Sequence, residues 1–289
     1  MSFYLLLSYF FIYGILGWCT EVGYAGVKQG KFVNRGFLNG PICPIYGVGI
    51  CIVVTLLTPL KDNLILLYIT STILVTILEG VTGYAMDKIF HNKWWDYSNQ
   101  PLNIGGYVCL VFSLVWGVAC VFVVDFIHPL IAMLVEHIPF IVLVIALVIF
   151  SIALFADLYV TSAAIFKLNK RLESMDKIAK ELHEISDQLG EGIFNQVSTT
   201  MEKQAATKEK YDETMERIAE AGLEFKEKTQ EVSEEMAGRV ASLKESYQEL
   251  AGKRSVISKR LVRAFPKMES RKHNDQLIKF KERLASLKK

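Results

Sequence analysis

Long apolar runs separated by short polar segments fill residues 1–166, and a charged pattern follows them. A helix needs roughly 18 or more apolar residues to cross ~30 Å of hydrocarbon, and five runs approach or exceed that length. We predict helices at about Phe3–Val27, Ile42–Leu57, Leu64–Tyr84, Gly106–Phe126 and Ile138–Phe166. The stretch Pro129–Val135 is too short to span, and we expect it to be re-entrant or interfacial. The pattern predicts an all-α fold, a polytopic membrane helix bundle with about five spans.

The pattern changes at Lys167, after which no Pro occurs before Pro266. Apolar residues recur there every three or four positions, which is typical of a coiled-coil-like helix. We expect a break at Gly190–Gly192. The predicted domains are a transmembrane domain (1–166), a cytoplasmic helical arm (167–265) and a basic C-terminal helix (266–289). The interrupted apolar seam leaves open whether the arm forms a parallel dimer or folds back on itself.

Charge predicts the orientation of the spans. Positively charged loops stay on the cytoplasmic side of a membrane. The loops after the first, third and fifth predicted spans are basic, and they carry Lys28, Lys31, Arg35, Lys88, Lys93, Lys167, Lys170 and Arg171. With five spans, all three basic faces agree if the N-terminus lies outside and the tail lies in the cytoplasm. No Lys or Arg precedes the first apolar run, so we expect that run to be retained and not removed as a signal peptide.

The tail has opposite charges at its two ends. Residues 167–252 hold 13 Lys/Arg and 19 Asp/Glu, whereas residues 253–289 hold 13 Lys/Arg and 3 Asp/Glu. Such a basic end suits anionic lipid, or the acidic stretch of the tail itself. Nucleic acid is a disfavoured partner, because no aromatic residues alternate with the basic ones to form a stacking platform.

Two parts of the membrane block resemble each other. "EVGY" at residues 21–24 precedes "LNGPIC" at 38–43, and "EGVTGY" at 79–84 precedes "LNIGGYVC" at 102–109. Each is a span that ends in Glu…Gly-Tyr, then a basic loop, then a return span. This order predicts a parallel two-helix repeat, with chance similarity as the alternative. Gly and Pro suit a helix start, so we expect Gly40-Pro41 to begin the second helix and Gly105-Gly106 the fourth.

Three acids fall at a similar predicted depth. At ~1.5 Å per residue, Glu21, Glu79 and Asp157 each lie ~23–28 Å along a span, near its inner boundary. A carboxylate inside a span costs on the order of 2.5–3.5 kcal/mol. Either each acid pairs with a loop cation or a helix start, or the three share a site for an ion, a proton or a headgroup. We predict a cytoplasm-facing site made of Glu21, Arg35, Asn39, Gly40, Pro41, Tyr46, Glu79, Trp95, Asp96, Asn103 and Asp157, with Arg35 as the counter-charge.

The loop "NKWWDYSNQPLNIGG" at residues 92–106 contributes part of that site. Its Trp and Tyr residues are types that settle at a membrane interface, which favours an anchor. The polar residues Asp96, Ser98 and Asn103 favour the alternative, a loop that folds back over the site.

Motifs for catalysis and metal binding are missing from the sequence. It contains no G-x-x-x-x-G-K-[ST] and no G-x-S-x-G, and its five Cys and five His lack metal-ligand spacing. We therefore predict no enzyme activity, no cofactor and no metal. The Cys residues serve as small apolar residues of the spans.

Three motifs together carry a family resemblance: "GWCTEVGY", "NRGFLNGPICPIYGVG" and "KWWDYSNQPLNIGGYVCLVFSLVWG". Over roughly residues 5–165 the chain resembles the ABC-transporter type IV membrane proteins of bacteria, a permease-like family. The resemblance implies a multi-pass protein of the bacterial cytoplasmic membrane. Its hallmarks correspond to Trp18, Glu21, Arg35, Gly40, Pro41, Pro44, Tyr46, Gly47, Trp95, Asp96, Tyr97 and Pro101.

Two functions follow as expectations. The first is a permease-like membrane protein with a cytoplasm-facing polar site. The alternative is a membrane-anchored scaffold whose coiled-coil arm organises partners. The expected partners are membrane lipid, a second copy of the chain through the tail, and a separate ATPase subunit.

Overall fold

The computed structural model describes residues 2–206, 215–252 and 255–286, with side chains described outside 189–233 and 286. The chain divides into two compact units. One contains Met1–Asn169 together with Arg254–Lys289, and the other contains Lys170–Lys253. The C-terminal residues therefore pack with the membrane block, although the arm separates the two in sequence. Each unit is described here by itself.

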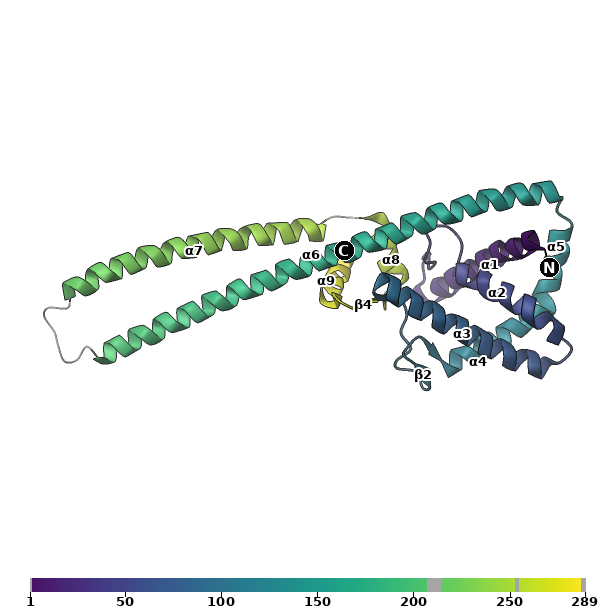
Figure 1. The fold of residues 1–289 in the computed structure, drawn as a ribbon, viewed down its shortest axis with the longest axis horizontal. Helices are drawn as coiled ribbons and strands as arrows, with labels where there is room; N and C mark the ends of the chain where they lie inside the picture. The colour runs from purple at the N-terminus through teal and green to yellow at the C-terminus, as the bar shows by residue number, and fades with distance from the viewer. Residues whose placement is uncertain (1, 207–214, 253–254, 287–289) are drawn as a thin grey trace. The chain divides into compact units, whose positions relative to one another are not determined.

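The first unit is built from helices (Figure 1). They are α1 (Phe3–Gln29), α2 (Pro44–Leu57) with the 3-10 turn Thr58–Leu60, α3 (Leu64–Phe90), α4 (Leu110–Phe122), the π-helical segment Val123–Ile127, α5 (His128–Glu136) and the start of α6 (Phe140–Ala206). This confirms the all-α prediction. The described residues also form four two-residue strands, which pair loop segments with one another.

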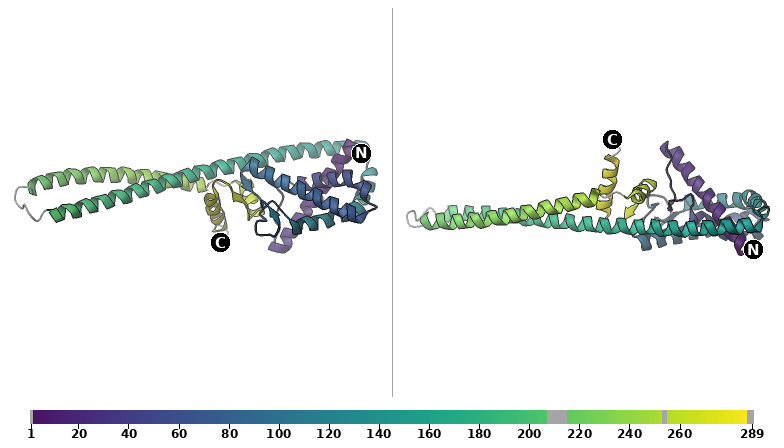
Figure 2. Two further views of the ribbon diagram at one scale, coloured as in Figure 1. Left: turned by 60° about the horizontal axis from the view of Figure 1, so that its bottom comes forward. Right: turned by 90° about the horizontal axis from the view of Figure 1, so that it is seen from above.

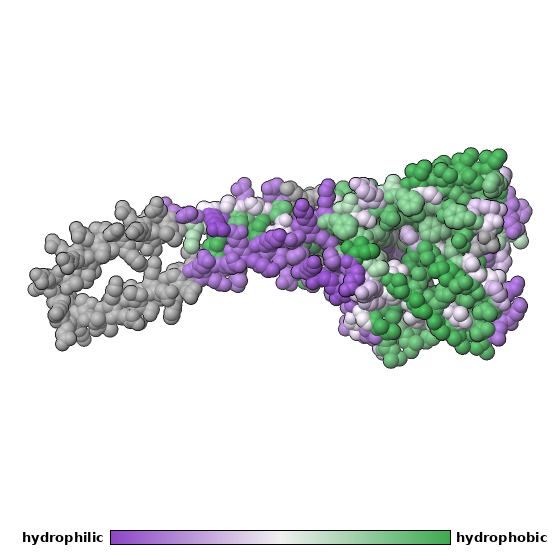
Figure 3. Space-filling model, viewed as in Figure 1, coloured by the Kyte–Doolittle hydropathy of each residue, from purple (hydrophilic) through white to green (hydrophobic). Residues whose placement is uncertain are grey.

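Within the described residues, four helical stretches are long and apolar enough to cross a membrane: Phe3–Gln29, Leu64–Phe90, Leu110–Glu136 and Phe140–Gln188. The second predicted span, at about Ile42–Leu57, corresponds to Pro44–Leu60, which is a shorter apolar helix. Large apolar side chains such as Ile77 (60% exposed) and Phe155 (68% exposed) point outward from these stretches. Apolar side chains also gather over the first unit in the space-filling view (Figure 3). So large an exposed apolar surface suits lipid and not water, and the chain is a multi-pass membrane protein.

Pro129–Val135 is not a separate segment, and its re-entrant or interfacial position stays a prediction. Helical backbone runs from Leu110 to Glu136 through α4, the π-helical segment and α5, and it forms one apolar stretch. Pro129 lies in the first turn of α5. Pro129 has no backbone N–H to donate. The wider π turn just before it already interrupts the regular pattern of helical backbone hydrogen bonds, so this donor is not needed there.

Both predicted Gly-based helix starts are also wrong. Helix α2 begins at Pro44, with Cys43 as the preceding extended residue, so Gly40-Pro41 lies in the loop. Gly105 and Gly106 have φ of 60° and 72°. They form the turn between β2 (Asn103–Ile104) and β3 (Val108–Cys109), which pair antiparallel. A left-handed backbone cannot continue into a right-handed helix, so α4 starts after β3.

The helices pack as two hairpins, α1 with α2 and α3 with α4. Close approach explains the first pair, because a Cβ on Gly17 would overlap the ring of Tyr46. One cluster of buried residues includes Tyr9, Phe11, Leu38 and Ile42, which join α1 to the loop that follows it. A second cluster joins α2, α3 and α4 through Val53, Leu57, Leu67, Cys120 and Val124.

The C-terminal segment of the first unit consists of α8 (Val256–Ala264), β4 (Glu269–Ser270) and α9 (Asn274–Ser286). Strand β4 pairs antiparallel with β1 (Asn92–Lys93), with Asn92 opposite Ser270 and Lys93 opposite Glu269. The backbone N–H of Arg271 also donates to the His91 carbonyl at 3.0 Å. Backbone hydrogen bonds therefore join the C-terminal segment to the loop between α3 and α4.

The second unit holds the remainder of α6 and helix α7 (Met215–Gly252), which run alongside each other (Figures 1 and 2). Arg239 on α7 pairs with Glu181 on α6, with 2.5 Å between Nη2 and Oε1. The predicted break at Gly190–Gly192 is wrong, since α6 is helical to Ala206. A Gly inside a helix costs about 1 kcal/mol relative to Ala, which a long helix tolerates.

Candidate functional site

The loop between α1 and α2 places its backbone around Asp157 of α6. Asn39 and Gly40 donate their N–H groups to the two carboxylate oxygens, at 3.1 and 2.7 Å. The Asn39 side-chain amide and the Thr161 hydroxyl also donate to Asp157, at 2.8 and 3.0 Å. Four hydrogen bonds therefore hold this carboxylate. The loop is neither helix nor strand, so its backbone N–H groups are available to bind a side chain. The exposed Pro41 follows Gly40 directly.

Asn34 holds the same loop from the other side. Its side-chain oxygen accepts hydrogen bonds from Trp18 Nε1 at 2.8 Å and from the Gly36 N–H at 3.1 Å. Its side-chain amide donates to the Asn39 carbonyl at 2.7 Å. Trp18, a residue of the family resemblance, thus positions the turn that presents Asn39.

Glu21 of α1 is held by two partners. Arg35 Nε lies 3.1 Å from Glu21 Oε2, and the Tyr46 hydroxyl donates to Oε1 at 2.7 Å. The Arg35 guanidinium also lies 4.9 Å from the centre of the Tyr24 ring. The predicted counter-charge therefore contacts Glu21, while neither Glu79 nor Asp157 is shown paired with Arg35.

Glu79 of α3 is held less completely. The Tyr97 hydroxyl donates to Oε1 at 3.3 Å, and Oε2 is buried without a hydrogen-bond partner among the described residues. Tyr97 itself stacks on Phe112 of α4, with 5.0 Å between ring centres. Burial raises the pKa of the Tyr97 hydroxyl, and the negative charges of Glu79 and, more weakly, Glu21 raise it further. Both acids therefore lie within electrostatic reach of this hydroxyl.

The structure gives each of the three predicted acids its own donors. Asp157 is bound by the α1–α2 loop, Glu21 by Arg35 and Tyr46, and Glu79 by Tyr97. The charge of Glu21 also contributes to the raised pKa of the Tyr97 hydroxyl that binds Glu79.

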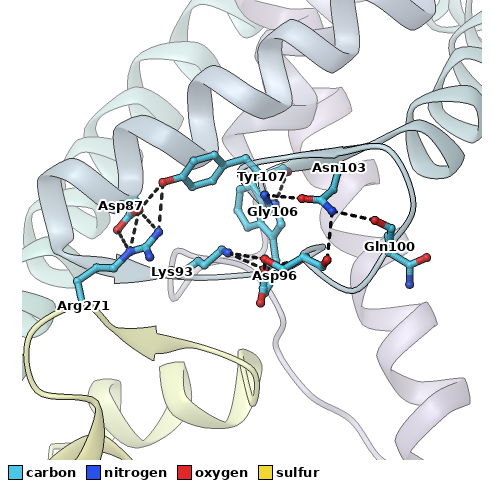
Figure 4. Close-up of polar contacts among 10 residues, drawn as sticks. Asp87, Lys93, Asp96, Gln100, Asn103, Gly106, Tyr107 and Arg271 are labelled. Atoms are coloured by element: carbon cyan, nitrogen blue, oxygen red, sulfur yellow. Dashed lines mark hydrogen bonds and ion pairs between the residues drawn. The ribbon is translucent and has the colours of Figure 1, made fainter.

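The loop between α3 and α4 binds mainly to itself (Figure 4). Lys93 Nζ lies 2.5 Å from Asp96 Oδ1, and Ser98 donates to the same oxygen through its N–H and its hydroxyl. Partial burial acts to raise the pKa of the Asp96 carboxyl, but the bonds from Lys93 and Ser98 outweigh it and lower the pKa to about 2. Asp96 thus serves the loop.

Asn103 and Trp95 serve this loop as well. The Asn103 amide donates to the Ser98 and Gln100 carbonyls at 3.1 and 2.8 Å, and its oxygen accepts from the Gly106 N–H at 3.2 Å. Trp95 Nε1 donates to the Tyr107 carbonyl at 2.8 Å. Both predicted site residues therefore have structural partners within the loop.

Arg271, which the sequence did not single out, ties the C-terminal segment to α3. Its guanidinium lies 2.6 Å from Asp87 Oδ2, and the Tyr107 hydroxyl donates to the same carboxylate (Figure 4). The hydrogen bond to Asp87 raises the pKa of Arg271 above its usual value. The basic character of residues 253–289 was a signal for an acidic partner, but it did not indicate which acid.

Arg260 of α8 reaches the α1–α2 loop and was also missed. It donates to the Gly36 and Phe37 carbonyls, both at 2.7 Å, and to the side-chain oxygen of Asn39 at 3.0 Å. Asn39 therefore bridges Arg260 and Asp157.

Aromatic packing supports these contacts. Trp94 lies edge-on to Phe265 with 5.0 Å between ring centres, and edge-on to Phe37 with 5.2 Å. Phe90 also packs against Phe37 at 5.4 Å. The two loops and the C-terminal segment thus meet at one aromatic cluster.

No group of three or more His, Cys, Asp or Glu within the described ranges could hold a metal ion. All five Cys are free thiols.

Residues 8–162 match the model of the family described as "Putative ABC-transporter type IV". The matched region contains Glu21, Arg35, Asn39, Glu79 and Asp157, and it ends before Arg260 and Arg271. Neither the curated proteins nor the solved structures contain a match to this chain.

Proposed function

This chain belongs to the ABC-transporter type IV family, and we propose that it is a permease-like membrane protein and not an enzyme. Its polar site lies at the loop ends of the spans, around Glu79, Tyr97 and Glu21, and handles a cation or a proton. No group of three or more His, Cys, Asp or Glu among the described residues could hold a metal ion for catalysis.

One observation carries this proposal: Glu79 Oε2 is buried and has no hydrogen-bond partner among the described residues. Leaving a buried polar atom unsatisfied costs on the order of 1–3 kcal/mol. A chain that needed only structure could place Leu at this position without that cost. A carboxyl that takes up a proton or a cation, in contrast, needs a lone pair that the protein leaves open.

The two hairpins support a common site. Glu21 on α1 accepts a hydrogen bond from Tyr46, and Glu79 on α3 accepts one from Tyr97. In each case the tyrosine follows the acid in sequence, but Tyr46 lies in α2 and Tyr97 lies in the loop well before α4. The parallel repeat, with Glu21 and Glu79 in equivalent positions, is therefore proposed from the sequence motifs alone. Arg35 forms an ion pair with Glu21, whereas Glu79 has no ion-pair partner among the described residues.

The proposal includes an orientation and partners. We place the N-terminus outside and the arm in the cytoplasm of a bacterial cell, because basic loops favour the cytoplasmic side of a membrane. The sequence lacks a phosphate-binding loop, so transport driven by ATP would need a separate ATPase subunit. Membrane lipid is the remaining partner.

Flux through proteoliposomes tests this function. Wild-type protein should move H⁺ or a monovalent cation down an imposed gradient, followed with an internal pH dye or a cation-sensitive dye. Glu79→Gln should lower that flux at least tenfold, because the amide cannot gain or lose a proton. Glu282→Gln, at an exposed site of α9, is the matched control and should retain the flux. Flux that survives Glu79→Gln, or no flux of any tested cation in wild type, would contradict the proposal.

A scaffold is the second candidate, and the extent of the arm favours it. Helix α6 continues well beyond its apolar part, and α7 returns beside it with the Arg239–Glu181 ion pair between them. The apolar residues that recur every three or four positions after Lys167 favour a coiled-coil arm that pairs with itself or with a second copy. If light scattering shows that the protein is a monomer in detergent, the homo-oligomer is removed from this proposal.

A further inference from the structure

The α1–α2 loop has two recognition faces. Its N–H groups at Asn39 and Gly40 turn toward Asp157. Its carbonyl oxygens at Gly36 and Phe37, with the side-chain oxygen of Asn39, turn toward Arg260. We name these three oxygens the acceptor cup. All three are neutral, and they engage three different nitrogens of one planar guanidinium.

The acceptor cup carries negative potential although none of its atoms is charged. Asn39 joins it to Asp157, since its amide donates to the carboxylate while its oxygen accepts from Arg260. Burial lowers the pKa of Arg260, and the charge of Asp157 acts in the opposite direction. Asp157 thus attracts a cation into the cup without contacting it, because its own oxygens are engaged by loop N–H groups and Thr161.

The cup is held in place by residues other than Arg260. Asn34 donates to the Asn39 carbonyl at 2.7 Å, and the Cys43 N–H donates to the Gly14 carbonyl at 2.9 Å. These residues and Asp157 lie within the family match at 8–162, whereas Arg260 lies outside it. The part of the chain that defines the family therefore builds the cup, and an appended segment fills it.

We propose that the acceptor cup is a binding site for a solute bearing a guanidinium group, and that Arg260 occupies it in cis as an autoinhibitory plug. A planar fork of N–H donors matches two carbonyls and an amide oxygen better than a compact ammonium does. The proposal rests on the proposed function, because it names the class of cation that the permease would accept. Release of α8 would open the cup at the loop end of the spans.

Chemical rescue with methylguanidinium tests the plug. The full-length chain in detergent is compared as wild type, Arg260→Ala and Arg263→Ala. Arg263 is an exposed residue of the same helix and provides the matched control. Methylguanidinium chloride is titrated in the millimolar range against sodium chloride at equal ionic strength, and the thermal midpoint is recorded. A ligand that binds only the folded state raises that midpoint in a saturable way.

Arg260→Ala should show a saturable upward shift with methylguanidinium, and wild type and Arg263→Ala should show none. Methylammonium at the same concentrations should give a smaller shift. Adding Asn39→Ala to Arg260→Ala should abolish the response. Should Arg260→Ala fail to fold, Arg260→Gln keeps most of the side-chain stem and is titrated in the same way. A response of either variant no larger than that to sodium chloride would overturn the proposal and leave Arg260 as a structural clamp.

The two proposals can fail separately. Loss of flux in Glu79→Gln without any methylguanidinium response in Arg260→Ala would keep the permease and reject the guanidinium site. A saturable response in Arg260→Ala with no flux of any tested cation in either wild type or Arg260→Ala would keep a guanidinium-binding cup and reject the permease.

Discussion

The loops after α1 and after α3 occupy matching places in the two helical hairpins, yet they use their polar groups differently. The α1–α2 loop directs its groups outward, to Asp157 of α6 and Arg260 of α8. The α3–α4 loop satisfies most of its groups internally, through Lys93, Asp96 and Asn103. An outward-directed loop depends on its partners, so it can respond when they move. An internally bonded loop keeps its shape, so it can serve as a fixed base.

The two asparagines show how one residue type can support both uses. Asn39 and Asn103 each follow a Leu in the two similar motifs. Asn39 bridges a carboxylate and a guanidinium that lie far away in sequence. Asn103 binds three backbone groups of its own loop. The difference arises from the turn at Gly105-Gly106, which folds the second loop over its own Asn.

The largest expected effect comes from removing the outward partner of the first loop. Asp157→Ala should lower the free energy of unfolding by about 3 kcal/mol, because the Asn39 and Gly40 donors lose a charged acceptor. Denaturant unfolding in detergent micelles measures this loss. Asp62→Ala, at an exposed site before α3, is the control and should change stability by less than about 0.5 kcal/mol. Equal values for the two variants would mean that the loop does not depend on Asp157.

A smaller effect is expected where the second loop meets the C-terminal segment. Arg271→Ala should cost about 1 kcal/mol, less than a buried charge pair would, because the arginine side chain is 48% exposed and solvent screens it. A double-mutant cycle with Asp87→Asn isolates the pairwise contribution. We expect a coupling of the same size between Arg271 and Asp87, and none between Arg271 and Asp157. Coupling to Asp157 would show that the two loops respond together.

A pH dependence is expected inside the second loop. The bonds to Asp96 lower its carboxyl pKa from 3.8 to about 2. Its contribution to stability is therefore complete above pH ~4 and is lost as the pH falls through about 2, because the unfolded state takes up the proton first. Asp96→Asn should flatten this part of the curve of unfolding free energy against pH. An unchanged slope between pH 4 and 2 in Asp96→Asn would contradict this assignment.

The sequence by itself determined the membrane character and the helical fold of this protein. Apolar runs such as Leu64–Tyr84 have only one stable use at that length, since a helix satisfies its own backbone and lipid covers its side chains. The pairing of Arg35 with Glu21 was also predictable, because the two residues flank the loop end of one span. The family resemblance was confirmed through motifs that lie in the same region.

Only the tertiary structure decided where the helices begin and what the loops bind. Gly and Pro suit both a helix start and a turn, so the residues at 40–41 and 105–106 could not distinguish the two until the backbone φ of the second pair was known. Arg260 and Asn39 are 221 positions apart, and Arg271 and Asp87 are 184 apart. Periodicity reports which face of a helix is apolar, but it carries no information about which distant charge completes a loop. That choice depends on the packing of the basic C-terminal segment with the membrane block in one compact unit.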